Sequence, residues 1–142
     1  MVQDMGQNLS KSKVIETLRE YNISPTQQRV EIAQILLGRP QHLSAEQVLA
    51  QVNEAGAKKV SKATVYNTLG LFARKGLVRE VIVDPSKVFY DSNTSEHHHF
   101  YNVDTGELMD IDADTLHLTE LPQLPEGTSA AGVDVIIRVR AQ

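Results

Sequence analysis

The stretch SKATVYNTLGLFARKG, residues 61–76, decides the fold of the first half of the chain. Val65, Leu69 and Phe72 recur at the spacing of one helix face, which predicts a buried apolar stripe. The opposite face carries two small and two polar residues: Ala63, Asn67, Gly70 and Arg74. The spacing therefore predicts a helix over residues 61–75, stopped by Gly76, whose outer face a partner can approach closely.

Three more helices are predicted before this stretch. The first covers residues 9–21. The second begins at Ser24, because an N-cap serine, a proline and Gln27 form a capping box there, and it runs to residue 37. The third begins at a second capping box, residues 44–47, and ends at Gly56.

Two short strands are predicted after the stretch, at residues 78–83 and 87–91, around the turn Asp84-Pro85-Ser86. Helices followed by a basic helix and a β-hairpin describe a winged helix-turn-helix, which we assign to residues 1–90. The alternative is any small helical domain with a solvated basic face.

The charge of the chain is unevenly distributed. The net charge of −4 is the sum of two unlike parts. Residues 1–90 carry 12 Lys/Arg and 8 Asp/Glu, whereas residues 91–142 carry 2 Lys/Arg and 10 Asp/Glu. Residues 55–79 hold six bases and no acid. Such asymmetry indicates two separate functions. We expect the basic part to bind phosphate groups and the acidic part to bind cations.

The second half, residues 91–142, changes character. Strands are predicted at residues 97–103 and 107–111 around a turn, and a third at 133–139. A short helix is predicted over 112–121, followed by a loop that contains Pro122 and Pro125. The resulting small sheet has an apolar edge, which favours pairing with a second copy of the chain as a homodimer.

Three consecutive histidines, His97, His98 and His99, lie on the first of these strands. Neighbours on a strand point to opposite faces, so His97 and His99 share one face and His98 takes the other. If Asp104 and Thr105 form a two-residue loop, His99 faces Asp110 on the next strand. Two imidazoles and a carboxylate suit Zn, Mn, Fe or Co. The alternative is a surface or tag-like histidine run.

Several classes of protein are excluded. The chain has 142 residues and no cysteine, which rules out disulfides, thiolate zinc and iron–sulfur clusters. The motifs HExxH, GxSxG and GxGxxG are absent, so we do not expect an enzyme. No apolar run reaches the ~20 residues of a membrane span, and no signal peptide is evident, so we expect a cytoplasmic protein.

Several motifs resemble those of the ferric uptake regulator (Fur) family, in the same order. They are Thr26-x-Gln28-Arg29, His42-x-Ser44-Ala45-Glu46, residues 61–69, Gly76-Leu77-Val78, Tyr90-Asp91 and the histidine triplet. Residues 88–93, 97–101, 107–111 and 124–127 look like the iron response regulator branch, which is known for haem-responsive control. The resemblance implies an α+β fold, with an N-terminal winged helix-turn-helix and a small α/β dimerisation domain over residues 91–142.

The resemblance also implies metal ligands. The family's regulatory site corresponds to His42, Asp91, His97, His99 and Asp110. Its second site corresponds to Glu96, His98, His117 and Asp134. The family's zinc cysteines are replaced by Asn102 and Thr105, and the Cys-Pro haem motif is absent, which leaves His97, His98 and His99 as the expected haem locus.

The functional expectation is an iron- or haem-responsive transcriptional regulator that binds operator DNA as a homodimer. Candidate DNA contacts are Lys62, Thr64, Tyr66, Asn67 and Arg74, with Tyr66 on a thymine methyl and Lys62 and Arg74 on phosphates. Haem or a divalent ion (Fe, Mn or Zn) would control affinity. The alternatives are a repressor activated by Mn or Fe, and a metal-buffering protein that binds no operator.

Overall fold

The computed structural model describes residues 9–39, 41–55, 59–95 and 97–142. The chain divides into two compact units, Met1–Thr94 and Ser95–Gln142, and it mixes helices with short strands, as predicted. Within the described residues, no helix is both long and apolar enough to cross a membrane.

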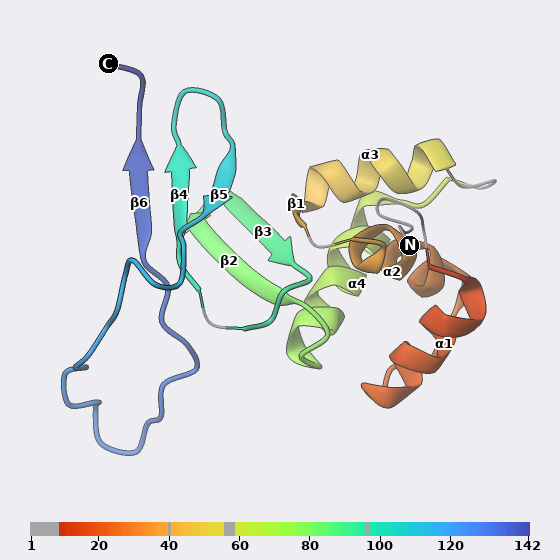
Figure 1. The fold of residues 1–142 in the computed structure, drawn as a ribbon. Coiled ribbons are helices and arrows are strands. Elements are labelled where there is room, and N and C mark those ends of the chain that lie inside the picture. Colours follow the sequence, from red (N-terminus) through yellow and green to blue (C-terminus); the bar gives the residue numbers. More distant parts are fainter. Residues whose placement is uncertain (1–8, 40, 56–58, 96) are drawn as a thin grey trace. The chain divides into compact units, whose positions relative to one another are not determined.

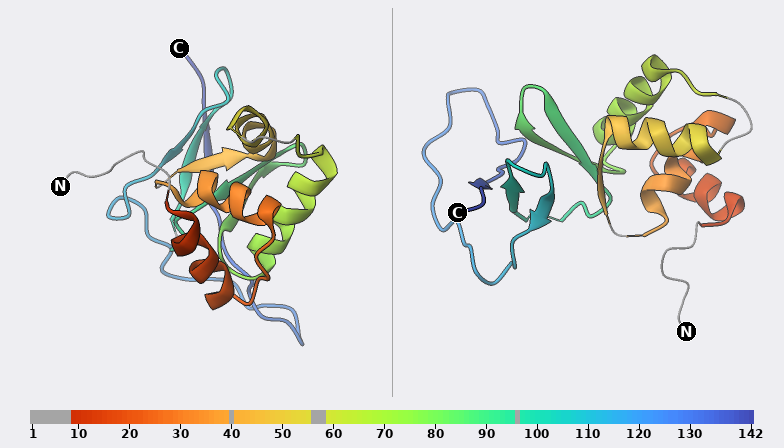
Figure 2. Two further views of the ribbon diagram at one scale, coloured as in Figure 1. Left: turned by 90° about the vertical axis from the view of Figure 1, so that its right-hand side faces the viewer. Right: turned by 90° about the horizontal axis from the view of Figure 1, so that it is seen from above.

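The described residues of the first unit form four helices and a three-stranded sheet (Figure 1). The helices are α1 (Lys11–Glu20), α2 (Gln27–Leu37), α3 (Ala45–Ala55) and α4 (Lys62–Arg74). The strands are β1 (His42–Ser44), β2 (Arg79–Asp84) and β3 (Lys87–Asp91), in the order β1-β3-β2. The helices gather together and the β2–β3 hairpin extends from them as the wing (Figure 2).

Helix α4 forms as its sequence predicts. The Ser61 side chain accepts a hydrogen bond from the Thr64 N–H at 3.1 Å, and Val65, Leu69 and Phe72 are fully buried. Gly76 adopts φ +82°, a left-handed conformation that favours glycine and turns the chain out of the helix. The apolar stripe therefore anchors α4 in the core and leaves its other face outside.

Helix α3 begins at the predicted capping box. The Ser44 hydroxyl accepts from the Gln47 N–H at 3.2 Å, and the Gln47 side-chain oxygen accepts from the Ser44 N–H at 2.8 Å. The predicted end at Gly56 lies outside the described residues.

The predicted start of α2 at Ser24 is wrong, because the N-cap is Thr26. Its hydroxyl accepts from the Arg29 N–H at 3.2 Å, and the helix begins at Gln27. The Ser24 carbonyl accepts instead from the Arg29 guanidinium at 2.9 Å, which keeps Ser24 outside the helix.

Strand β1 was not predicted from the sequence, since three residues are too few to show a period of two. It pairs with β3 in antiparallel register and sets His42 opposite Asp91. This pairing brings together two side chains that are 49 positions apart in the sequence.

The second unit is built on a small sheet with the order β5-β4-β6 (Figure 1). Its strands are β4 (His99–Asn102), β5 (Leu108–Asp110) and β6 (Ile136–Val139), with β6 parallel to β4. The predicted register of His99 opposite Asp110 is confirmed. The turn is longer than the predicted two residues, because the Gly106 N–H closes back on the Asn102 carbonyl at 2.8 Å.

The predicted helix over residues 112–121 is wrong. Asp112 instead closes a single turn, in which its carbonyl accepts from the Thr115 N–H at 3.0 Å. Leu118 and Leu121 are exposed, so a helix here would gain little from packing an apolar face. The chain between β5 and β6 consequently makes a long excursion without regular structure (Figure 1).

The N-cap position of Thr26 predicts how two substitutions change the stability of the protein. Thr26→Ala should lower the free energy of unfolding by about 1 kcal/mol, because it removes the N-cap acceptor. Ser24→Ala should change it by less than about 0.5 kcal/mol, as for an ordinary surface substitution. Urea unfolding monitored by circular dichroism measures both values. A larger loss in Ser24→Ala than in Thr26→Ala would contradict the assignment.

Candidate metal centre and DNA-binding helix

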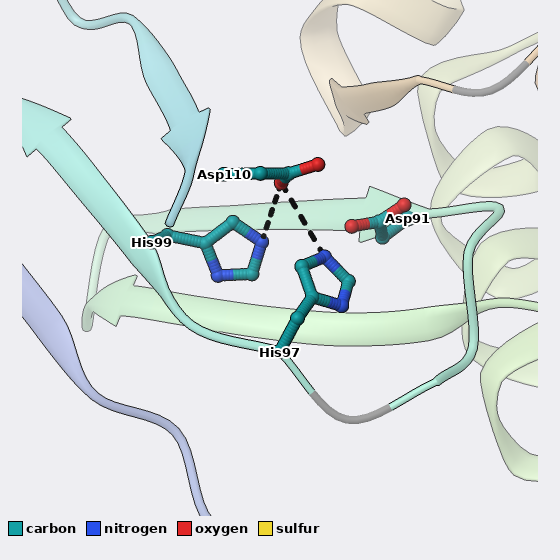
Figure 3. A group of neighbouring side chains, drawn as sticks. All are labelled: Asp91, His97, His99 and Asp110. Carbon is teal, nitrogen blue, oxygen red and sulfur yellow. Dashed lines mark ion pairs between the residues drawn. The ribbon is translucent and has the colours of Figure 1, made fainter. Parts of the chain in front are cut away.

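Two histidines of the triplet converge on one carboxylate in the second unit. The Nε2 atoms of His97 and His99 each lie 3.3 Å from Oδ1 of Asp110. The rings are 4.6 Å apart between centroids, and both histidines are buried. Figure 3 shows the two rings turned towards Asp110, and also draws Asp91. The predicted shared face of His97 and His99 is confirmed, but the predicted strand over residues 97–103 is shorter, since β4 begins at His99.

The hydrogen bonding of His97 suits a metal ligand. Its Nδ1 lies 2.8 Å from the Ser95 carbonyl, which can only accept, so Nδ1 carries a proton. Nε2 then faces Asp110, and as a metal ligand it would direct its lone pair at an ion shared with that carboxylate. A carbonyl acceptor behind a ligating histidine is a common way to fix its orientation and tautomer.

The donor set fits a divalent transition metal. One donor atom from each of His97, His99 and Asp110 lies within 4.8 Å of the others, close enough for one ion to bind all three. Two imidazoles and a carboxylate accept Mn, Fe, Co or Zn. The site therefore has the chemistry of a metal centre, and the donor types do not select one metal among these.

The other two expected ligands, His42 and Asp91, lie in the first unit. They occupy paired positions of β1 and β3, so their side chains are close neighbours on the sheet. Asp91 is buried and accepts from the Asn93 N–H at 2.9 Å, while the His42 ring packs edge-on against Phe89. The first unit thus presents a second imidazole–carboxylate pair.

His98 differs from its two neighbours, as its opposite strand face predicts. Its Nδ1 accepts a hydrogen bond from the Val135 N–H at 3.0 Å. The neutral ring then carries its proton on Nε2, the reverse of His97. His98 must lose this hydrogen bond or turn before it can bind a metal.

The expected second metal site stays a prediction. His98 and His117 line one cavity of about 390 Å³, which includes the apolar side chains of Leu116 and Leu121. Glu96 lies outside the described residues, and Asp134 precedes the Val135 that bonds to His98.

The candidate DNA-binding residues lie on the outer face of α4. Four of them have exposed side chains: Lys62, Tyr66, Asn67 and Arg74. Thr64 is half-buried, and its side-chain oxygen accepts a hydrogen bond from the Ser61 hydroxyl at 2.9 Å. The face of α4 away from the core therefore offers two cations, an amide and an aromatic ring, which suits DNA contacts.

The sequence does not predict one contact on this face. The Tyr66 hydroxyl donates to Oε2 of Glu46, on the first turn of α3, at 2.7 Å. The two residues are 20 positions apart and belong to different helices, so no local pattern indicates the pair.

A comparison with protein families decides the classification. The model of the ferric uptake regulator family matches residues 20–134. The chain belongs to this family. It is therefore a metal-responsive transcription regulator of the Fur type, and not an enzyme.

Individual relatives agree with this classification. The chain is 32% identical over 99 residues to the peroxide operon regulator of Bacillus subtilis, covering 70% of this chain and 68% of that protein. It is 30% identical over 112 residues to a peroxide-responsive repressor, PerR, of Staphylococcus aureus, covering 79% and 70%. These Fur-family relatives are peroxide regulators, and assignment to the iron response regulator branch is not supported.

A solved structure agrees as well. The ferric uptake regulator of Pseudomonas aeruginosa, determined with manganese, superposes with a TM-score of 0.65 at 29% identity, covering 89% of this chain and 96% of that one. The predicted fold class, a winged-helix DNA-binding domain with a small dimerisation domain, is confirmed by such neighbours.

The metal centre gives a binding prediction. His99→Ala should weaken Mn²⁺ binding by more than about 100-fold, because losing a ligand costs more than losing a hydrogen-bonding partner of one. His98→Ala is the matched control and should leave the affinity of this site unchanged. Isothermal titration calorimetry measures both. Loss of the site in His98→Ala with retention in His99→Ala would contradict the ligand assignment.

Proposed function

We propose that this Fur-family chain is a repressor that binds operator DNA as a homodimer when a divalent metal ion occupies the site of His97, His99 and Asp110. The observation that carries the proposal is the convergence of two imidazoles on one carboxylate in a chain that also presents a winged helix. We assign DNA binding to the first unit, and sensing and dimerisation to the second.

His42 and Asp91 supply the link between metal and DNA in this proposal. They are paired on the sheet of the first unit, the unit that carries α4. An ion that takes ligands from both units binds best to the arrangement in which those ligands meet. It shifts the protein towards that arrangement by its differential affinity, and towards DNA if the same arrangement fits the operator.

Manganese and iron are the proposed ions. The donor set accepts both, and the Pseudomonas aeruginosa neighbour was determined with manganese. The names of the curated relatives, a peroxide-responsive repressor among them, favour repression as the output. Operator DNA and a second copy of the chain are the partners, and the proposed location is the cytoplasm.

Haem at His97, His98 and His99 is the competing signal, expected from the iron response regulator resemblance. It predicts that haem lowers operator affinity and that the His97/His98/His99→Ala triple variant abolishes both the Soret shift and this effect. A metal ion acting through His97, His99 and Asp110 instead raises affinity and needs no haem.

The metal dependence of DNA binding tests the proposal. Wild type should select a duplex motif from random oligonucleotides in the presence of Mn²⁺, and its affinity for that duplex should fall at least about fivefold in EDTA, the lower end of ordinary allosteric coupling. Asp110→Asn should remove the Mn²⁺ response, and Asp112→Asn, the same change two residues further on, should keep it. Selection of no motif would favour a metal-buffering protein. Equal affinity with and without Mn²⁺ would refute the metal switch.

The phosphate role of Lys62 gives a separate prediction. Lys62→Ala should weaken binding to every duplex alike and reduce the slope of log affinity against log salt by about one unit. Lys13→Ala, on the exposed face of α1, is the control and should keep the wild-type slope. Fluorescence anisotropy over a salt series measures both. An unchanged slope in Lys62→Ala would remove it from the interface.

A further inference from the structure

The hydrogen bond between Tyr66 and Glu46 joins the outer face of α4 to the start of α3. It is short, at 2.7 Å between the hydroxyl oxygen and Oε2, and the tyrosine is the donor because a carboxylate can only accept. The single proton of the hydroxyl is therefore engaged within the protein. Tyr66 has none left to donate to a phosphate or to a base acceptor.

The Tyr66 ring has a second contact of its own. The Lys62 ammonium lies 5.6 Å from the ring centroid, within the range of a cation–π interaction. With one face beside a cation and the hydroxyl held by Glu46, the ring is restrained at two points. Tyr66 nevertheless keeps 36% of its surface exposed, so its remaining carbon atoms are open to a partner.

The chemistry of the pair is stable at neutral pH. The hydrogen bond from Tyr66 lowers the pKa of the Glu46 carboxyl, and it raises the pKa of the Tyr66 phenol. Glu46 thus stays an acceptor and Tyr66 stays a donor. The charge of Glu46 also repels phosphate oxygens from the hydroxyl end of the ring.

We propose that Glu46 is a positioning residue for base recognition: by accepting the Tyr66 hydroxyl proton, it fixes the ring as an apolar reader of a thymine methyl group. The inference rests on the proposed DNA-binding function and adds a residue outside the expected DNA contacts. The thymine methyl is the one apolar group that a base pair presents in the major groove, so a ring with its hydroxyl engaged matches it.

A purely structural role for Glu46 makes a different prediction. An acidic residue in the first turn of a helix is stabilising through the helix dipole, and Glu46 occupies that place in α3. On that account, Glu46→Ala lowers the stability of the domain but leaves the discrimination between bases intact. The loss of affinity when a thymine of the duplex is replaced by deoxyuridine, called methyl discrimination below, therefore separates the two roles.

The experiment uses full-length protein and the duplex that wild type selects from random oligonucleotides in Mn²⁺. Each thymine is replaced in turn by deoxyuridine, which removes only the methyl group. At one position per half-site, this replacement should weaken the binding of wild type roughly fourfold, which is the loss expected when one buried methyl group is removed. In Glu46→Ala and in Tyr66→Phe this loss should shrink below about twofold, because the ring is no longer held.

Two further variants serve as controls. Glu46→Gln should keep the methyl discrimination, because its amide oxygen accepts the same proton, and should bind all duplexes more tightly because the repulsive charge is gone. Glu54→Ala removes a carboxylate from the far end of α3 and should keep the discrimination of wild type. Circular dichroism checks that each variant is folded, and Tyr66→Phe tests the inference even if Glu46→Ala does not fold.

The outcomes distinguish this inference from the proposed function. Full methyl discrimination in both Glu46→Ala and Tyr66→Phe would overturn the positioning role. A wild type that binds its selected duplex without discriminating thymine from deoxyuridine at any position would also overturn it, while leaving operator binding intact. A wild type that selects no duplex would instead refute the proposed function.

Discussion

The shared carboxylate of Asp110 is the interaction on which the proposed metal sensing by the second unit depends. Two imidazole nitrogens lie 3.3 Å from one oxygen: the β4–β5 register sets His99 opposite Asp110, and His97 reaches the same oxygen from the segment just before β4. The Ser95 carbonyl fixes His97 with its Nε2 towards this oxygen, whereas Val135 fixes His98 in the reverse tautomer. Two neighbouring histidines, His97 and His98, thus acquire different chemistry from the backbone groups that surround them.

The proposed DNA binding by the first unit depends on the division of α4 into two faces. Val65, Leu69 and Phe72 are fully buried and fix the helix, so its other face remains available to DNA. A ring on that face, Tyr66, is nonetheless restrained, because its hydroxyl donates a hydrogen bond to Glu46. Rigid placement of an aromatic group reduces the conformational entropy lost on binding, which favours selective recognition over loose attraction to phosphate.

Local patterns predicted much of this structure. The α4 stripe, the Ser44–Gln47 capping box and the facing of His99 and Asp110 follow from periodicity, capping chemistry and strand alternation. Thr26 displaced Ser24 as N-cap because two suitable caps stand two residues apart, and both fit the local pattern; the Arg29 N–H bonds to the Thr26 hydroxyl, and the Arg29 guanidinium bonds to the Ser24 carbonyl. The predicted helix over residues 112–121 is absent, and two of its leucines, Leu118 and Leu121, are exposed rather than packed in a core. The Glu46–Tyr66 contact and strand β1 arise from long-range packing, which no local spacing encodes.

Metal and operator must influence each other equally if the ion at His97, His99 and Asp110 controls DNA binding, since coupling between two binding sites is reciprocal. The most direct measurement is a calorimetric titration of Mn²⁺ into the protein with and without its selected duplex. The account predicts that the duplex lowers the Mn²⁺ dissociation constant by the same factor by which Mn²⁺ raises duplex affinity. An identical Mn²⁺ affinity in the presence and absence of the duplex would contradict it.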